Sequence, residues 1–313
     1  MSNPFDSPQL FRVSCPDAHV APVDGATPGR HDVAWWQWGD AASPHVIVCV
    51  HGLTRNGRDF DVLAQALLAR ADGRLRVVCP DVAGRGESDW LADPSGYQIP
   101  FYVADMLVLL ADLQRRAPIE RLDWVGTSMG GLIGMIVAGQ PDLPLPKPIE
   151  RLVLNDVGPA IEWAALARIG EYVGVPVRFE SVEQAADLMW RASPTFGAHT
   201  PQQWLALTAP MLKPAPGGGW QLHYDPGIAL PLKNVTAESV AKGEASLWQV
   251  YDQITAKTLL TRGAQSDLLT PATAQAMTQR GPKARLVEFE GVGHAPMFVV
   301  PDQLEVAASF LLD

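Results

Sequence analysis

The chain has 313 residues, 47% of them hydrophobic and 19% charged, which excludes disordered and fibrous proteins and allows a large buried core. Its formal net charge of −10 and a pI near 5.1 argue against a nucleic-acid partner and against an anionic membrane surface. The three cysteines are an odd number, and two of them lie in apolar runs, so we expect reduced core residues.

Residues 1–9 show neither the basic start nor the apolar stretch of a secretory signal. No window of the sequence approaches the roughly 18 uninterrupted apolar residues of a membrane span. We therefore expect a cytoplasmic protein with no membrane partner.

Strand-like apolar runs alternate with helical patterns along most of the chain. The strand-like runs, in chain order, cover residues 35–39, 45–50, 76–79, 122–125, 152–155, 258–263 and 285–289. Helical spacing of apolar residues appears at residues 60–70, 101–115, 132–138 and 301–312. This alternation predicts an α/β fold with a mostly parallel sheet flanked by helices.

The alternation stops between residues 158 and 246. Capping-box patterns, Ser181 with Gln184 and Thr200 with Gln203, predict helices there, and a tract rich in proline and glycine covers residues 213–220. We expect this segment to be a helical cap inserted after the sixth core strand. The predicted core domain then comprises residues 1–157 and 247–313, and the predicted cap comprises residues 158–246.

Residues 126–130 read Gly-Thr-Ser-Met-Gly and stand between a strand-like run and an apolar helical segment. A serine on so sharp a strand-to-helix turn needs neighbours almost without side chains, and Gly126 and Gly130 meet that need. The turn exposes the serine hydroxyl and points the unpaired N–H groups of the helix at any oxyanion formed there. Ser128 is therefore the candidate nucleophile.

A serine hydroxyl needs a base to take its proton and a carboxylate to orient that base. Asp267 follows the strand-like run at residues 258–263, and His294 follows the run at residues 285–289. Ser128, Asp267 and His294 thus occur in the chain order serine, acid, histidine, each just after a strand. They form the predicted catalytic triad.

Over nearly its whole length, from about Asp32 onward, the sequence resembles the α/β-hydrolase superfamily. Besides the turn at Ser128, it has His51-Gly52 directly after a strand-like run and the loop Pro-Asp-Val-Ala-Gly-Arg-Gly-Glu-Ser at residues 80–88. The resemblance implies that Ser128 is the nucleophile, Asp267 the acid and His294 the base. It also implies that the backbone N–H groups of Leu53 and Met129 form the oxyanion hole.

Two alternatives concern residues near this site. Asp156 follows the sixth strand, from which some members of the superfamily draw the acid, and is otherwise expected to order the start of the cap or to contact substrate. Arg55 either binds a substrate carboxylate or fixes its own loop through Asp81 or Asp156. His51 is expected to support the oxyanion loop rather than act as a base.

Tryptophans are frequent in and beside the predicted cap: Trp163, Trp190, Trp204, Trp220 and Trp248. In one interpretation they fill the core of the cap, and in the other one or two of them line an apolar pocket. Trp90 is the tryptophan that we expect near the mouth of that pocket. The seven histidines show no metal-ligand spacing, and no dinucleotide fingerprint occurs, so we expect neither a metal nor a cofactor.

These features predict a carboxylesterase-like serine hydrolase acting on a small, largely apolar substrate, with a lactone or thioester as alternative ester types. One alternative function is a carbon–carbon bond hydrolase of the aromatic-degradation type, which would need cationic groups in the cap, where the candidates are Arg168, Arg178, Arg191 and Lys213. Another is a cofactor-free haloperoxidase or perhydrolase, and a third is a ligand-binding receptor on the same fold. The expected partner is a small-molecule substrate, and a homodimer is compatible with the sequence.

Overall fold

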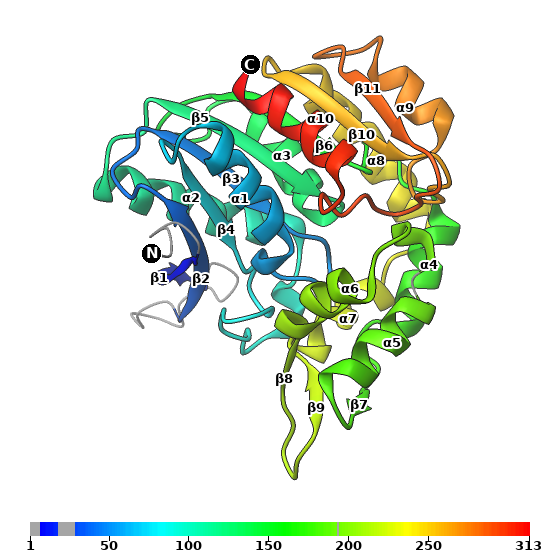
Figure 1. Cartoon of the computed structure of the whole chain (residues 1–313). Helices are drawn as coiled ribbons and strands as arrows, with labels where there is room; N and C mark the ends of the chain where they lie inside the picture. The colour runs from blue at the N-terminus through cyan, green and yellow to red at the C-terminus, as the bar shows by residue number, and fades with distance from the viewer. Residues whose placement is uncertain (1–6, 18–28, 193) are drawn as a thin grey trace, which may run out of the picture.

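The computed structural model describes residues 7–17, 29–192 and 194–313. Its main sheet has eight strands in the order β1-β2-β4-β3-β5-β6-β10-β11 (Figure 1). Their bounds are β1 Gln9–Pro16, β2 Arg30–Gly39, β3 His45–Val50, β4 Arg76–Pro80, β5 Arg121–Thr127, β6 Ile149–Asn155, β10 Lys257–Gly263 and β11 Arg285–Phe289. The pairs β1–β2 and β2–β4 are antiparallel and the other neighbouring strands are parallel. The predicted mostly parallel sheet is confirmed, with β1 as an additional edge strand.

Apolar side chains cover both faces of this sheet. One hydrophobic cluster joins the sheet to α1 and α10, and a larger cluster joins it to α2, α3 and α8. These helices span α1 Asp61–Arg70, α2 Ile99–Arg116, α3 Met129–Gly139, α8 Ala237–Asp252 and α10 Pro301–Leu312, and α9 covers Pro271–Met277. Short 3₁₀ turns lie at Gly57–Phe60, Pro94–Gly96, Pro194–Phe196, Ala209–Met211 and Pro226–Ile228. None of the helices in the described ranges is long and apolar enough to cross a membrane.

The segment between β6 and β10 contains most of the remaining elements (Figure 1). It holds the helices α4 Trp163–Tyr172, α5 Val182–Ala192, α6 Pro201–Thr208 and α7 Ala229–Lys233. It also holds a small antiparallel sheet of β7 Arg178–Phe179, β9 Trp220–Leu222 and β8 Leu212–Pro214, which the sequence did not predict. Thr200 and Gln203 form the predicted capping box of α6. Because α8 runs through residues 246 and 247, the predicted domain boundary falls inside one continuous helix.

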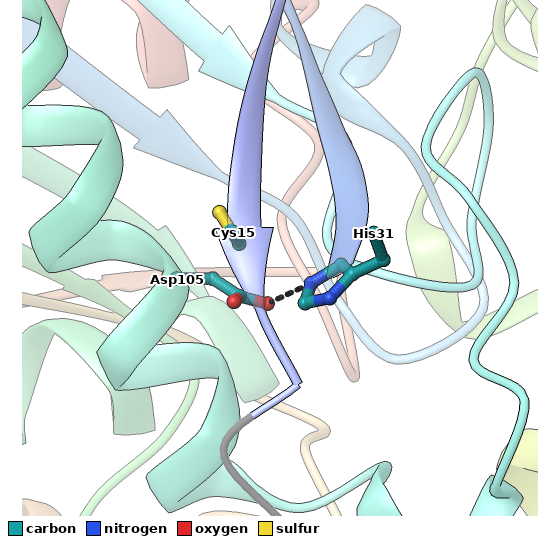
Figure 2. Close-up of side chains that lie close together, drawn as sticks. All are labelled: Cys15, His31 and Asp105. Atoms are coloured by element: carbon teal, nitrogen blue, oxygen red, sulfur yellow. Dashed lines mark hydrogen bonds and ion pairs between the residues drawn. The ribbon is translucent and has the colours of Figure 1, made fainter. Parts of the chain in front are cut away.

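A buried polar network fastens β1 and β2 to α2 (Figure 2). Nδ1 of His31 lies 2.7 Å from the carboxylate of Asp17, and its Nε2 lies 3.1 Å from that of Asp105. The hydrogen bonds to these carboxylates raise the pKa of His31 against the opposing effect of burial. Cys15 lies beside Asp105, and burial raises the pKa of its thiol, so the cysteine is an unreactive core residue.

Candidate active site

Ser128 occupies the sharp turn between β5 and α3. Its backbone has φ 52° and ψ −116°, a strained conformation for a residue with a side chain. The two glycines around it are required by close approach, because a Cβ on Gly130 would overlap the carbonyl oxygen of Val50 and one on Gly126 would overlap the backbone of Gly130 itself. The strand, strained serine and helix predicted from the sequence are therefore present.

His294 links Ser128 to a carboxylate. Its Nε2 lies 3.0 Å from Oγ of Ser128, and its Nδ1 lies 2.7 Å from Oδ2 of Asp156. A carboxylate can only accept, so Nδ1–H donates to Asp156 and leaves the lone pair of Nε2 free to take the serine proton. The three side chains form one continuous hydrogen-bonded chain with the geometry of an activated nucleophile.

Asp156 is held in place by three donors. Its side chain is completely buried and accepts hydrogen bonds from the backbone N–H of Gly263 at 2.9 Å and from the Ser266 hydroxyl at 2.6 Å, besides that from His294. Its own N–H donates to the carbonyl of Thr261 at 2.8 Å. All these groups come from β10, the loop after it or the His294 loop, which fixes the carboxylate at the end of β6.

Asp267, the predicted acid, does not contact His294. Its side chain is 50% exposed and forms an ion pair at 2.6 Å with Arg168 of α4. The loop after β10 does contact the carboxylate that faces His294, but through the hydroxyl of Ser266 rather than through Asp267. The predicted pairing of Asp267 with His294 is therefore wrong, and the residue that orients the histidine is Asp156, the alternative considered from the sequence.

The two predicted oxyanion donors lie in adjoining segments. Met129 is the first residue of α3, so its N–H has no acceptor within the helix. The loop that carries Leu53 is joined to this helix by the Gly130 N–H, which donates to the carbonyl of His51 at 3.1 Å. Their role as oxyanion donors remains a prediction that this arrangement supports.

His51 fixes that loop, as predicted. Its Nδ1–H donates to the carbonyl of Gly52 at 2.7 Å, and its Nε2 accepts from the N–H of Val82 at 2.9 Å. Complete burial lowers the pKa of His51 to about 3, so the ring is neutral at neutral pH. Asp81, the residue before Val82, is a buried acceptor for the backbone N–H groups of Gly57 and Glu87 and for the indole N–H of Trp36.

Arg85 is a site residue that the sequence analysis missed. It is fully buried, and its guanidinium donates to the carbonyl of Leu53 at 2.8 Å, to the carbonyl of Ala83 at 2.6 Å and to the hydroxyl of Tyr102 at 2.8 Å. A weaker contact at 3.7 Å reaches Sδ of Met129. Arg85 thus touches both residues whose N–H groups are the predicted oxyanion donors. Its position between two glycines of the loop at residues 80–88 was the available signal.

Arg55 and Trp90 were predicted to bind substrate. The guanidinium of Arg55 is buried and forms two hydrogen bonds with Asp59, at 2.7 and 2.5 Å, so the expected alternative partners Asp81 and Asp156 are not the ones it uses. The same group also donates to the carbonyl of Leu207 at 3.1 Å. Trp90 is 45% exposed, and the ammonium of Lys213 lies 4.1 Å from the centre of its ring. Neither residue contacts Ser128, His294 or Asp156 through these interactions.

One cluster has the side chains of a metal site. Cys15, His31 and Asp105 place their candidate ligand atoms within 4.8 Å of one another (Figure 2). Both ring nitrogens of His31 already have a carboxylate partner, so the polar groups of the network need no metal ion. These ion pairs join the strands β1 and β2 to α2. The hydrogen bonds of the network, from His31 to Asp17 and Asp105, involve none of the residues of the Ser128–His294–Asp156 chain.

Comparison with known proteins identifies sequences and structures that are similar to this chain. Residues 47–308 match the family model described as "Alpha/beta hydrolase family". The chain is 48% identical over 307 residues to a 3-hydroxybutyrate-oligomer hydrolase of Cupriavidus necator, covering 97% of this chain and 98% of the relative. A crystal structure of a putative hydrolase from Rickettsia typhi has a TM-score of 0.80 and 28% identity, with 97% of this chain and 98% of that chain covered. An α/β hydrolase from Novosphingobium aromaticivorans has a TM-score of 0.77 and 31% identity at the same coverage.

Proposed function

Because the chain belongs to the α/β-hydrolase family, we propose that it is a serine ester hydrolase that cleaves short oligomers of 3-hydroxybutyrate through an acyl-enzyme. The observation that carries the proposal is the continuous hydrogen-bonded chain from Ser128 through His294 to Asp156. The substrate class is taken from the relative that is 48% identical over nearly the full length of both chains.

The mechanism follows from the donor directions at the site. His294 Nε2 takes the hydroxyl proton of Ser128 as the serine oxygen attacks the ester carbonyl carbon, and the same proton then passes to the departing alcohol oxygen. Asp156 holds the imidazole in the Nδ1–H tautomer and stabilises the positive charge that forms on it. Water attacks the resulting ester of Ser128 with His294 again as the base, which releases the acid and restores the serine.

The negative charge that develops on the carbonyl oxygen needs preorganised donors. The N–H groups of Leu53 and Met129 are the proposed pair, and loss of one such donor typically costs about 100- to 1000-fold in rate. His51 donates to the carbonyl of Gly52 and Arg85 donates to the carbonyl of Leu53. These hydrogen bonds hold the loop that carries the Leu53 N–H. The buried positive charge of Arg85 also favours a nearby oxyanion.

The arrangement of cations favours an ester over a carbon–carbon substrate. Among the cationic groups that a dicarboxylate-like substrate would need, Arg168 is paired with Asp267 and Arg191 with Asp187. Arg178 donates to the carbonyls of Pro216 and Gly218 in the turn between β8 and β9, and the ammonium of Lys213 lies over the ring of Trp90. A linear oligomer of 3-hydroxybutyrate carries a single terminal carboxylate, so it needs fewer cationic partners than a dicarboxylate-like substrate.

The test is hydrolysis of the dimer and trimer of 3-hydroxybutyrate by the wild-type enzyme, by Ser128→Ala and by Ser246→Ala, a matched change on the exposed face of α8. Release of monomer is measured, and a serine-reactive phosphonate labels the enzyme for peptide mapping. We expect hydrolysis and labelling of Ser128 in the wild type and in Ser246→Ala, and neither in Ser128→Ala. Full activity of Ser128→Ala would contradict the assignment of the nucleophile.

A further inference from the structure

Two consecutive residues at the end of β6 contact the segments that carry Ser128 and His294. Strand β6 lies between β10 and β5, and β5 ends one residue before Ser128 (Figure 1). Asp156 accepts from His294, as described above. The residue before it, Asn155, is completely buried, and its backbone carbonyl accepts from the N–H of Ser128 at 3.0 Å. The side chain of Asn155 takes no part in the proton transfers of the proposed mechanism.

The side-chain amide of Asn155 joins three segments of the site. Thr127, Asn155 and Thr261 are register partners across β5, β6 and β10. The NH₂ group of the amide donates to the carbonyl of Pro296 at 2.7 Å and to the hydroxyl of Thr127 at 3.0 Å, and its Oδ1 accepts from the hydroxyl of Thr261 at 2.8 Å. Thr127 directly precedes the nucleophile, and Pro296 lies two residues after the catalytic histidine. The amide therefore connects the nucleophile strand, the histidine loop and β10.

An amide fits these three partners better than a carboxylate or an apolar side chain does. The carbonyl of Pro296 can only accept, which fixes the NH₂ group of Asn155 on that side and its oxygen on the side of Thr261. A carboxylate at this position would set an acceptor against that carbonyl. An apolar side chain would leave all three partners without a hydrogen bond to residue 155. Because both amide hydrogens and the amide oxygen are used, the group is held from three sides.

The transfer of the serine proton depends on the distance between two of these segments. Oγ of Ser128 lies on the turn after β5, and Nε2 of His294, 3.0 Å away, lies on the loop between β11 and α10. Among the described residues, the Asp156 carboxylate bonds to His294, to the end of β10 and to the loop after it, whereas the Asn155 amide also bonds to β5. Misplacing a catalytic group by about 1 Å can cost about 100-fold in rate. The rate therefore depends on what holds the serine turn and the histidine loop together.

We propose that Asn155 is a positioning residue that sets the distance between Oγ of Ser128 and Nε2 of His294. Its amide holds the residue before the nucleophile and the loop of the base on one buried group, and the pairing of β6 with both neighbouring strands fixes that group in turn. Asn155 acts through His294 and transfers no proton itself. The inference rests on the proposed function, since it concerns the same serine and histidine.

The experiment measures kcat and KM for p-nitrophenyl butyrate, and the rate at which phosphonate labels Ser128, in the wild type, Asn155→Leu and Thr261→Val. Asn155→Leu removes all three hydrogen bonds of the amide. Thr261→Val removes only the donor to Oδ1, so it weakens the same connection in a variant that should fold even if Asn155→Leu does not. Thr258→Val is the matched control, because it makes the same exchange three residues earlier on β10, where the buried hydroxyl donates to the carbonyl of Ala256 at 3.0 Å. Urea denaturation gives the free energy of unfolding of each variant.

We expect kcat and the labelling rate to fall about 10- to 100-fold in Asn155→Leu and about three- to tenfold in Thr261→Val. KM should stay within about twofold of the wild type, because acylation and deacylation both use His294 and slow together. Thr258→Val should lose as much stability as Thr261→Val and keep the wild-type kcat. A wild-type kcat in Thr261→Val, a change confined to KM, or an equal loss of kcat in Thr258→Val would overturn the positioning role.

A second measurement separates positioning of His294 from a general disturbance of the site. In a His294→Ala background, the remaining hydrolysis comes from the oxyanion hole and substrate binding alone. Adding Thr261→Val to that background should change the remaining rate less than about twofold, because the group that it positions is absent. A further loss as large as that in the wild-type background would show that the amide does not act through His294.

Failure of the positioning role and failure of the proposed function give different results. If the wild type hydrolyses p-nitrophenyl butyrate and phosphonate labels Ser128, but the Asn155 and Thr261 variants match the wild type, the serine esterase stands and the positioning role falls. If the wild type hydrolyses neither this ester nor the 3-hydroxybutyrate dimer and Ser128 is not labelled, both fall together.

Discussion

The Asp156→Asn variant distinguishes most clearly between Asp156 and Asp267 as the residue that orients His294. In Asp156→Asn, Oδ1 would still accept from the N–H of Gly263, so the amide nitrogen takes the place of Oδ2, which faces His294 and Ser266. The opposite orientation of the amide would set its NH₂ against the Gly263 N–H and is disfavoured. The Ser266 hydroxyl can rotate and become an acceptor, but the imidazole can only avoid two facing donors by moving its proton to Nε2.

That tautomer cannot take the proton of Ser128, since Nε2 then carries a hydrogen itself. The corresponding change in serine proteases lowers kcat about 10⁴-fold, or about 5.5 kcal/mol of transition-state stabilisation. We expect a loss of this size in Asp156→Asn. The control is Asp267→Asn, which removes a half-exposed ion pair with Arg168, an interaction worth about 0–1 kcal/mol, so kcat/KM should stay within about fivefold of the wild type.

The assay is kcat and KM on the 3-hydroxybutyrate dimer at neutral pH, with circular dichroism and urea denaturation to verify folding. The rate of phosphonate labelling of Ser128 reports the nucleophile independently of substrate binding. If Asp267→Asn loses as much activity as Asp156→Asn, or if Asp156→Asn retains more than about a tenth of the wild-type kcat, the reasoning from hydrogen-bond directions is refuted.

Three further predictions concern residues next to the proposed oxyanion hole. The folded-state pKa of His51 is about 3 and its unfolded value about 6.5, so the unfolded chain binds more protons below pH 6.5, and this residue should contribute about 2 kcal/mol less stability at pH 5 than at pH 7 or above. Urea denaturation at both pH values should show that difference between the wild type and His51→Gln, and parallel curves would contradict it. Arg85→Met should lower kcat about 10- to 100-fold with a smaller change in KM, because the Leu53 carbonyl loses its donor, and a normal kcat in a folded variant would argue against that role. Gly130→Ala should destabilise the protein by about 3 kcal/mol through the clash with Val50, which thermal denaturation would detect, and an unchanged melting temperature would exclude the clash.

Much of the site could be predicted because strand ends leave a local signal. Ser128 and His294 each follow a short apolar run, and parallel strands bring their carboxyl ends to one edge of the sheet, so the two side chains meet although 166 residues separate them. The fold class follows from the same alternation of runs and helices. Strand β1 was missed although the signal was present, since Phe11, Val13 and Cys15 alternate with exposed residues and pack against the core.

The acid could not be assigned from the sequence, since β6 and β10 are neighbours in the sheet and an aspartate follows each of them. What decides between them is the path of two short loops. Asp156 adopts φ 56°, which turns its side chain toward His294, whereas Asp267 is drawn outward to Arg168. Neither a backbone dihedral nor a partner on a distant helix is visible as a residue pattern.

The proximity of Ser266 to the acid has a consequence for how such enzymes diverge. Its hydroxyl lies 2.6 Å from the Asp156 carboxylate, so a carboxyl group carried by residue 266 would reach nearly the same point beside the histidine. Two carboxylates side by side in this buried site would each disfavour the charged form of the other, so the acid can move between the two loops only if one is lost as the other is gained. The serine turn, whose glycines have no room for a side chain, allows no comparable exchange.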